Sequence, residues 1–111
     1  MTDLLTREEY KTLAAKLALP TSAFIDGSYR PAHSGKTFST VNPATGDTLA
    51  EVAACGTEDV EFAVVKAREA FDDGRWSKLH PSERKDILIR FAKLLTRNRR
   101  ELAVMESLDS G

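Results

Sequence analysis

The sequence contains a single cysteine, Cys55, so it cannot form an internal disulfide. It has no apolar run near the ~20 residues that a membrane-spanning helix needs. Its first residues, MTDLLTREEY, lack the basic-then-apolar pattern of a secretion signal. With 16 basic and 17 acidic residues, no excess of charge would draw the chain to nucleic acid or to an acidic membrane. These absences favour a cytoplasmic location and no nucleic-acid or membrane partner.

Motifs that bind phosphate or metal ions are also missing. There is no G-x-G-x-x-G and no P-loop, and the glycines are isolated where turns or helix ends are expected. His33 and His80 lie far apart without metal-ligand spacing, so we expect structural roles for both. Cys55 has no neighbouring base in the sequence, and we expect a buried or half-buried structural thiol. The residues alone therefore predict no catalytic site and no cofactor-binding site.

The first half of the chain changes from a helical to a strand pattern. A capping box from Thr6 to Glu9 opens a short amphipathic helix, which we expect to dock on another element. From residue 23 onward, short antiparallel strands are expected. The Asp26-Gly27 pair predicts a two-residue hairpin turn. Strands over 36–41 and 48–53 then flank a sharp corner, Asn42 to Asp47.

The second half reads as helices with apolar stripes. Thr57 is expected to cap a helix that Gly74 ends, and Pro81 fits the first position of the next helix. The polar stretch 96–100 is expected to bend or break that helix. Four short strands cannot cover both stripes, so we expect an isolated chain to expose an apolar patch and to associate. The stripes include Val60, Val64 and Phe71, and Leu88, Phe91 and Leu95.

Basic residues gather in the later helices, but acidic residues are interleaved with them. We interpret them as a solvated helix face, or a face toward another part of a larger protein, rather than a DNA contact. The basic residues are Arg84, Lys85, Arg90, Lys93, Arg97, Arg99 and Arg100.

Several ordered stretches resemble the N-terminus of the NAD(P)-dependent aldehyde dehydrogenases. They are FIDGSY, GKTFSTVNPATGDTLAEVA, EDVEFAVVKAREAF and WSKLHPSERKDILIRFAKLLTRNRRELAVMESLDSG. The first helix and AFDDGRWSKLHPSERK are most similar to bacterial members that act on γ-glutamylamino- or guanidinobutyraldehyde in polyamine and arginine breakdown. We therefore expect a capped helix and link over 1–22, and an incomplete N-terminal part of the cofactor-binding domain over 23–111.

The resemblance implies an α/β fold in three parts: a Rossmann-like cofactor domain, a catalytic domain and a small oligomerisation hairpin. This chain would supply the N-terminal helix, the short antiparallel strands and two to three helices that flank the cofactor domain. Family members form homodimers or homotetramers. In them, a cysteine thiolate attacks an aldehyde, hydride passes to NAD(P)+, and water activated by a glutamate releases the acid.

The family's nucleophile, general base, oxyanion asparagine and cofactor motifs all lie beyond the position equivalent to Gly111, and Cys55 does not match the nucleophile. The E-S-L-D-x-G segment is normally followed by Lys-Pro. We therefore expect a truncated enzyme that is inactive and binds no NAD or NADP by itself, with the rest of an aldehyde dehydrogenase as its partner. The alternative is a non-catalytic interaction module that associates with a full-length homologue.

One functional site of the family falls inside the chain. Several members bind Na+ or K+ through backbone oxygens at the T-[VI]-N-P corner and the aspartate of L-D-x-G. The matching positions are Thr40, Val41 and Asp109. The site also needs a ligand from beyond Gly111. The alternative is an empty corner in which Asp109 caps local backbone.

Overall fold

The computed structural model describes residues 4–111, which alternate between helices and short strands. In chain order the elements are α1 (Arg7–Lys16), β1 (Ala23–Ile25), β2 (Ser28–Arg30), β3 (Thr37–Val41), β4 (Thr48–Ala53), α2 (Thr57–Asp72), α3 (Pro81–Arg97) and α4 (Arg99–Ser110). This mixture agrees with the expected α/β class.

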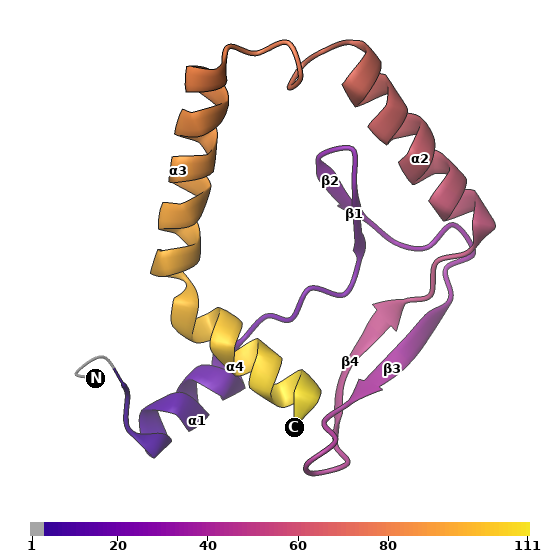
Figure 1. Ribbon diagram of the computed structural model, residues 1–111. Coiled ribbons are helices and arrows are strands. Elements are labelled where there is room, and N and C mark those ends of the chain that lie inside the picture. Colours follow the sequence, from indigo (N-terminus) through magenta and orange to yellow (C-terminus); the bar gives the residue numbers. More distant parts are fainter. Residues whose placement is uncertain (1–3) are drawn as a thin grey trace.

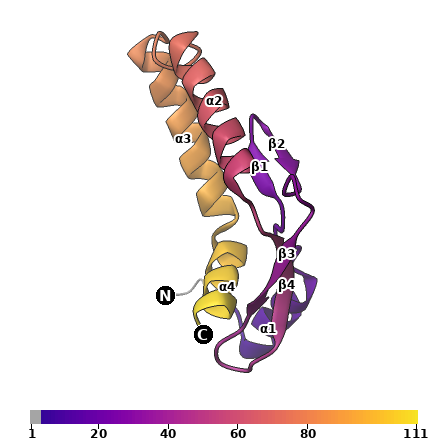
Figure 2. The same cartoon turned by 90° about the vertical axis from the view of Figure 1, so that its right-hand side faces the viewer.

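The elements form an open frame rather than a packed globule. In Figure 1, α2 and α3 form two sides of the frame, α4 and α1 lie at its base, and the β1–β2 hairpin lies beside α2. Seen edge-on in Figure 2 the frame is thin, and its extents are 48 × 40 × 18 Å. Its radius of gyration is 17.9 Å, against about 13 Å for a compact domain of this length.

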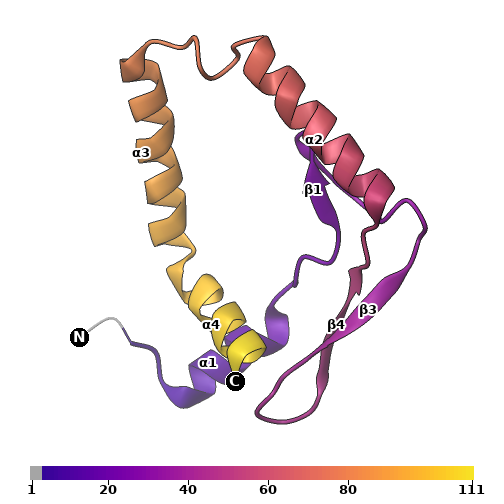
Figure 3. The same ribbon diagram turned by 45° about the vertical axis from the view of Figure 1, so that its right-hand side comes forward.

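The first helix begins with the predicted capping box. The Thr6 amide donates to Glu9 Oε2 at 2.8 Å, and the Glu9 amide donates to Thr6 Oγ1 at 3.2 Å. Its apolar side chains, including Tyr10 and Leu13, are half-buried. The helix packs against α4, as Figure 3 shows, so the expectation that it docks on another element is confirmed.

The strands form two separate hairpins rather than one sheet. β1 pairs with β2 around Asp26 and Gly27, whose φ angles are 55° and 79°. These positive angles suit a tight hairpin turn, so the predicted turn is confirmed. β3 pairs with β4 in a second sheet, and their register is irregular between Thr40 and Val41.

The corner between β3 and β4 closes on itself. The Asn42 amide donates to the Asp47 carbonyl at 2.8 Å, and the Gly46 amide donates to the Asn42 carbonyl at 2.8 Å. The Asn42 side chain accepts from the Ala44 amide at 2.9 Å. The chain's last residue lies against this corner, because a side chain at Gly111 would meet the Pro43 ring at 2.9 Å.

The helix ends follow the predictions with one exception. Gly56, not Thr57, is the N-cap of α2, so the expected Thr57 cap is wrong. The reason is that the Asp59 carboxylate already accepts the Gly56 amide, at 2.9 Å. His80 caps α3 by accepting from the Ser82 amide at 3.2 Å. The predicted break between α3 and α4 is confirmed at Asn98.

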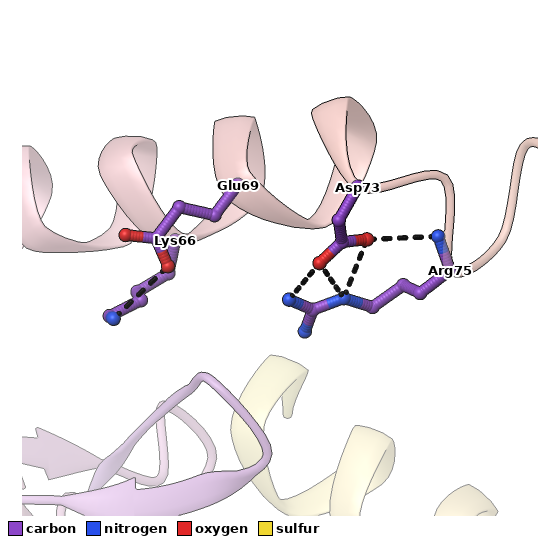
Figure 4. Close-up of polar contacts among 4 residues, drawn as sticks. All are labelled: Lys66, Glu69, Asp73 and Arg75. Carbon is purple, nitrogen blue, oxygen red and sulfur yellow. Dashed lines mark hydrogen bonds and ion pairs between the residues drawn. The ribbon is translucent and has the colours of Figure 1, made fainter.

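The link after α2 is held by a forked ion pair. Arg75 donates through Nη2 to Asp73 Oδ2 at 2.6 Å and through its own amide to Asp73 Oδ1 at 2.9 Å (Figure 4). The side-chain hydrogen bond from Arg75 lowers the pKa of Asp73. One turn earlier, Lys66 Nζ lies 3.1 Å from Glu69 Oε2. These contacts direct the chain from α2 toward α3.

Candidate functional site

The residues 4–111 hold no cluster of three or more histidine, cysteine, aspartate or glutamate side chains that could bind a metal ion. Cys55 is free and exposed, so the expectation of a buried or half-buried thiol is wrong. It lies in the link between β4 and α2, on a surface that no other element of the described chain covers. Ser82 Oγ lies 2.7 Å from His80 Nδ1, but both residues are exposed at the start of α3, where His80 caps the helix.

Two of the three residues predicted to bind a cation lie at one pocket. Thr40 and Asp109, far apart in the sequence, line one pocket of about 350 Å³ between β3–β4 and α4. Val41, the third predicted position, is exposed and does not line it. Glu106 lines the same pocket, and the sequence pattern had not indicated it. A helical spacing of three residues puts Glu106 and Asp109 on one face of α4 and could have identified it.

The oxygen atoms of this pocket suit a hard cation, because carboxylate and backbone oxygens are the ligands such ions prefer. The Thr40 hydroxyl itself donates to the Ala50 carbonyl at 3.4 Å. The remaining walls are mostly apolar, including Leu49 and Met105. Two acidic residues of α4 and Thr40 of β3 thus line the same pocket. The set of Thr40, Val41 and Asp109 stays a prediction.

A buried carboxylate joins the strands to α2, and sequence reasoning missed its role. Asp59 is only 7% exposed. It accepts the His33 amide on Oδ1 and the Gly56 amide on Oδ2, each at 2.9 Å. These two backbone hydrogen bonds lower the pKa of Asp59. Its place in the first turn of a helix could have indicated the Gly56 contact, but no sequence signal indicates a partner 26 residues away.

Two further contacts cross the same region, which comprises residues 30–36 and 54–62 and which we call the junction. His33 Nε2 lies 2.7 Å from Glu58 Oε2, so His33 has the structural role expected for it. The Arg30 guanidinium lies over the Phe62 ring at 4.0 Å. Polar and cation–π contacts therefore tie β2 and the following link to α2.

The apolar faces of α2 and α3 remain open to solvent, as expected. Val64 is 62% exposed and Phe91 is 55% exposed, values typical of side chains that nothing covers. The molecular surface is 8,613 Å², whereas a compact protein of 12.2 kDa has about 6,000 Å². The excess of about 2,500 Å² is in the range that obligate protein interfaces bury. The open faces of α2 and α3 therefore form the candidate site: a docking surface.

The described residues also have no helix that is long and apolar enough to cross a membrane.

Comparison with known proteins gives one consistent family. Residues 29–111 match the aldehyde dehydrogenase family. The whole chain is 60% identical to aminoacetaldehyde dehydrogenase of Pseudomonas aeruginosa over 111 residues, which is 22% of that protein. The chain therefore spans about a fifth of the length of this relative.

Solved structures agree with the sequence match. The γ-glutamyl-γ-aminobutyraldehyde dehydrogenase of Burkholderia cenocepacia J2315 superimposes with a TM-score of 0.91 and 46% identity, over 94% of this chain and 21% of that one. A mutant of the P. syringae indole-3-acetaldehyde dehydrogenase AldA, in complex with NAD+ and IAA, gives a TM-score of 0.91 and 47% identity. That match covers 95% of this chain and 21% of the other. The open frame is thus a piece of a known fold, and the chain belongs to the N-terminal region of the aldehyde dehydrogenase family.

Proposed function

We propose that this chain forms the N-terminal part of an NAD(P)-dependent aldehyde dehydrogenase that oxidises an aminoaldehyde to its carboxylic acid in polyamine or arginine breakdown. The observation that carries the proposal is the open docking surface of α2 and α3 in a chain that matches this family. Large apolar side chains in water are unfavourable unless another surface covers them. The partner proposed for these faces is the rest of an aldehyde dehydrogenase.

The substrate class is proposed from the relatives. Aminoacetaldehyde and γ-glutamyl-γ-aminobutyraldehyde, the substrates in two relatives' names, both carry a nitrogen group and an aldehyde. An aminoaldehyde is therefore the class that these similarities support. The P. syringae relative was solved with NAD+, which supports a nicotinamide cofactor for the complete enzyme.

The chain itself supplies no reacting group in this proposal. Its exposed Cys55 has no histidine or lysine beside it in the sequence, and the family's nucleophile lies outside the residues present. We therefore propose that the isolated chain is inactive and binds neither NAD nor NADP. Its contribution is to complete the cofactor domain by covering it with α2 and α3.

A monovalent cation, Na+ or K+, is proposed at Thr40, Val41 and Asp109. The position of Thr40 and Asp109 in one pocket, beside the carboxylate of Glu106, supports this site. The cation would fasten the corner between β3 and β4 to the end of α4. A further oxygen ligand would come from the rest of the enzyme.

The test is a chimera in which residues 1–111 replace the matching N-terminal segment of the P. aeruginosa aminoacetaldehyde dehydrogenase. We expect NAD+-dependent oxidation of aminoacetaldehyde within about tenfold of the parent enzyme, because 60% identity preserves most of the contact surface. The isolated chain should give no turnover. A chimera that fails to assemble would contradict the docking role, and turnover by the isolated chain would contradict its inactivity.

A second candidate is a non-catalytic module that associates with a full-length homologue. The same exposed α2 and α3 faces favour it, because they could occupy the place of the homologue's own N-terminal segment. Co-expression with the full-length P. aeruginosa enzyme tests this. Co-purification of a stable complex would support it, and separate elution of the two proteins would exclude it.

A further inference from the structure

The junction contains a charged group that the chain buries by itself. Asp59 is 7% exposed, although it is a carboxylate on the outside of an open frame. A buried carboxylate is unfavourable unless hydrogen bonds satisfy its oxygens. Both are satisfied here, one by the Gly56 amide three residues away and one by the His33 amide 26 residues away. The pair of contacts thus joins a local cap to a distant segment.

Other contacts cross the junction near the same carboxylate. The Ala54 amide donates to the Lys36 carbonyl at 2.8 Å, directly before α2 begins. Ala32, next to His33, is 4% exposed and is the buried apolar side chain of the described residues. The most enclosed part of the frame therefore lies around Asp59, and every group that encloses it belongs to this chain.

We propose that the Asp59 carboxylate is a pin that fixes the start of α2 against residues 31–36, and that it holds without the remainder of the enzyme. Because α2 leaves the junction as a rigid helix, the pin sets the direction of its open apolar face. The chain would then present that face in one orientation before anything docks on it. This goes beyond the proposed function, since it concerns a conformation that the isolated chain adopts.

The charges around the carboxylate support its ionised form. The hydrogen bonds from the Gly56 and His33 amides lower the pKa of Asp59, and the positive charge of Arg30 on β2 lowers it further. Glu58 is the acidic neighbour on α2, but its carboxylate is turned to the His33 ring at 2.7 Å. Lys36 also lies at this surface. A negative charge at Asp59 is therefore compensated from the link, from β2 and from the helix start.

Hydrogen exchange followed by NMR on the full chain tests the pin. In Asp59→Asn, the amide NH₂ faces one of the two backbone N–H donors whichever way it turns. We expect the His33 or the Gly56 amide to exchange about 10- to 100-fold faster than in the unmodified chain. The matched control is Glu58→Gln, which removes the exposed ion pair with His33. It should change both amides by less than about threefold.

The Asn42 amide, bonded within the corner at the far end of β3–β4, is the internal reference. Its exchange should be unchanged in Asp59→Asn. An equal increase at Asn42 would show that Asp59 only stabilises the chain as a whole, and would overturn the proposal. So would unprotected His33 and Gly56 amides in the unmodified chain, or an Asp59→Asn variant that leaves both amides protected.

Discussion

The junction and the open faces of the helices are built in opposite ways. At the junction, a carboxylate that prefers water is buried and its two oxygens are satisfied by amides of the same chain. On α2 and α3, side chains that avoid water, such as Val64 and Phe91, are left in it. Hydrogen bonds between nearby segments can be completed within 111 residues. The apolar stripes of α2 and α3, in contrast, are left uncovered by residues 4–111.

The difference separates the contacts that residues 4–111 complete among themselves from the surfaces that they leave exposed. Each hydrogen bond to Asp59 at the junction requires only one amide placed within hydrogen-bonding distance of the carboxylate. Hydrophobic stabilisation, in contrast, grows with the area removed from water, at about 25 cal/mol per Å². The open frame exposes apolar side chains on α2 and α3, and its other elements do not cover them. We therefore expect the junction to be ordered in the isolated chain and the open faces to associate with apolar surfaces.

The largest effect is expected from a charge placed on the open face. Phe91→Asp should prevent assembly of the chimeric enzyme, because an unpaired buried carboxylate costs several kcal/mol. In the isolated chain the same change should alter the free energy of unfolding by less than about 0.5 kcal/mol, since the side chain is 55% exposed.

Size-exclusion chromatography and aminoacetaldehyde oxidation measure the first effect, and urea unfolding measures the second. Phe91→Leu is the control and should still assemble. A large loss of stability in the isolated chain would show that the face is already packed there, and would remove the contrast with the junction.

A smaller effect is expected at the end of α2. Gly74 has a φ of 72° and is buried, so Gly74→Ala should destabilise the chain by about 1–2 kcal/mol. The new methyl group would also displace the Lys78 side chain, which now lies where it would be. Gly74→Asn should cost less, because asparagine tolerates this backbone conformation. Urea unfolding measures the free energy of unfolding of both variants. An equal loss of stability in the two would argue against backbone strain as the cause.

Removal of the cap of α1 should have an effect of about 1 kcal/mol. Thr6→Ala removes the acceptor for the Glu9 amide, and lost N-caps cost about this much. Exchange of the Glu9 amide and helix content by circular dichroism report the change. Thr12→Ala, in the middle of the helix, is the control and should not lower helix content. If Thr6→Ala leaves α1 intact, packing on α4 rather than the cap holds it.

The smallest effect is expected from a change of pH. The difference in the free energy of unfolding between the unmodified chain and Asp59→Asn should disappear at low pH. The amides of Gly56 and His33 hold the pKa of Asp59 below its ordinary value of 3.8. The charged carboxylate therefore contributes stability that is complete above this value and is lost as the pH falls through the lower, folded-state pKa. Urea unfolding of the unmodified chain and Asp59→Asn from about pH 6 to about pH 3 should converge at the acid end. A gap that widens toward acid would contradict the buried, ionised pin.

Most local structure could be predicted from short-range chemistry. The hairpin turn at Asp26-Gly27, the capping box at Thr6 and the break at Asn98 all depend on residues within a few positions of one another. The Thr57 cap failed for a local reason as well, because the Asp59 carboxylate takes the Gly56 amide instead. The division into 1–22 and 23–111 stays a prediction, and residues 1–3 lie outside the described part.

The candidate site was less predictable. The resemblance named Thr40, Val41 and Asp109 together. Thr40 and Asp109 line one pocket and Val41 does not, whereas Glu106 lines it and was not foreseen. Cys55 was expected to be at least half covered and is exposed in the link between β4 and α2. The burial of a side chain depends on which distant segments pack against it. The spacing of apolar residues along the chain does not identify those segments.

Most elements and most of their ends followed from the sequence alone, because capping, turn chemistry and apolar spacing act between near neighbours. The family followed from the resemblance of its ordered motifs. The sequence also determined that two helices would carry more apolar surface than four short strands can cover. Only the tertiary structure decided that the strands form two hairpins instead of one sheet and that Asp59 reaches the amide of His33. That contact joins residues 26 positions apart, and a contact of that length exists only after the frame has folded.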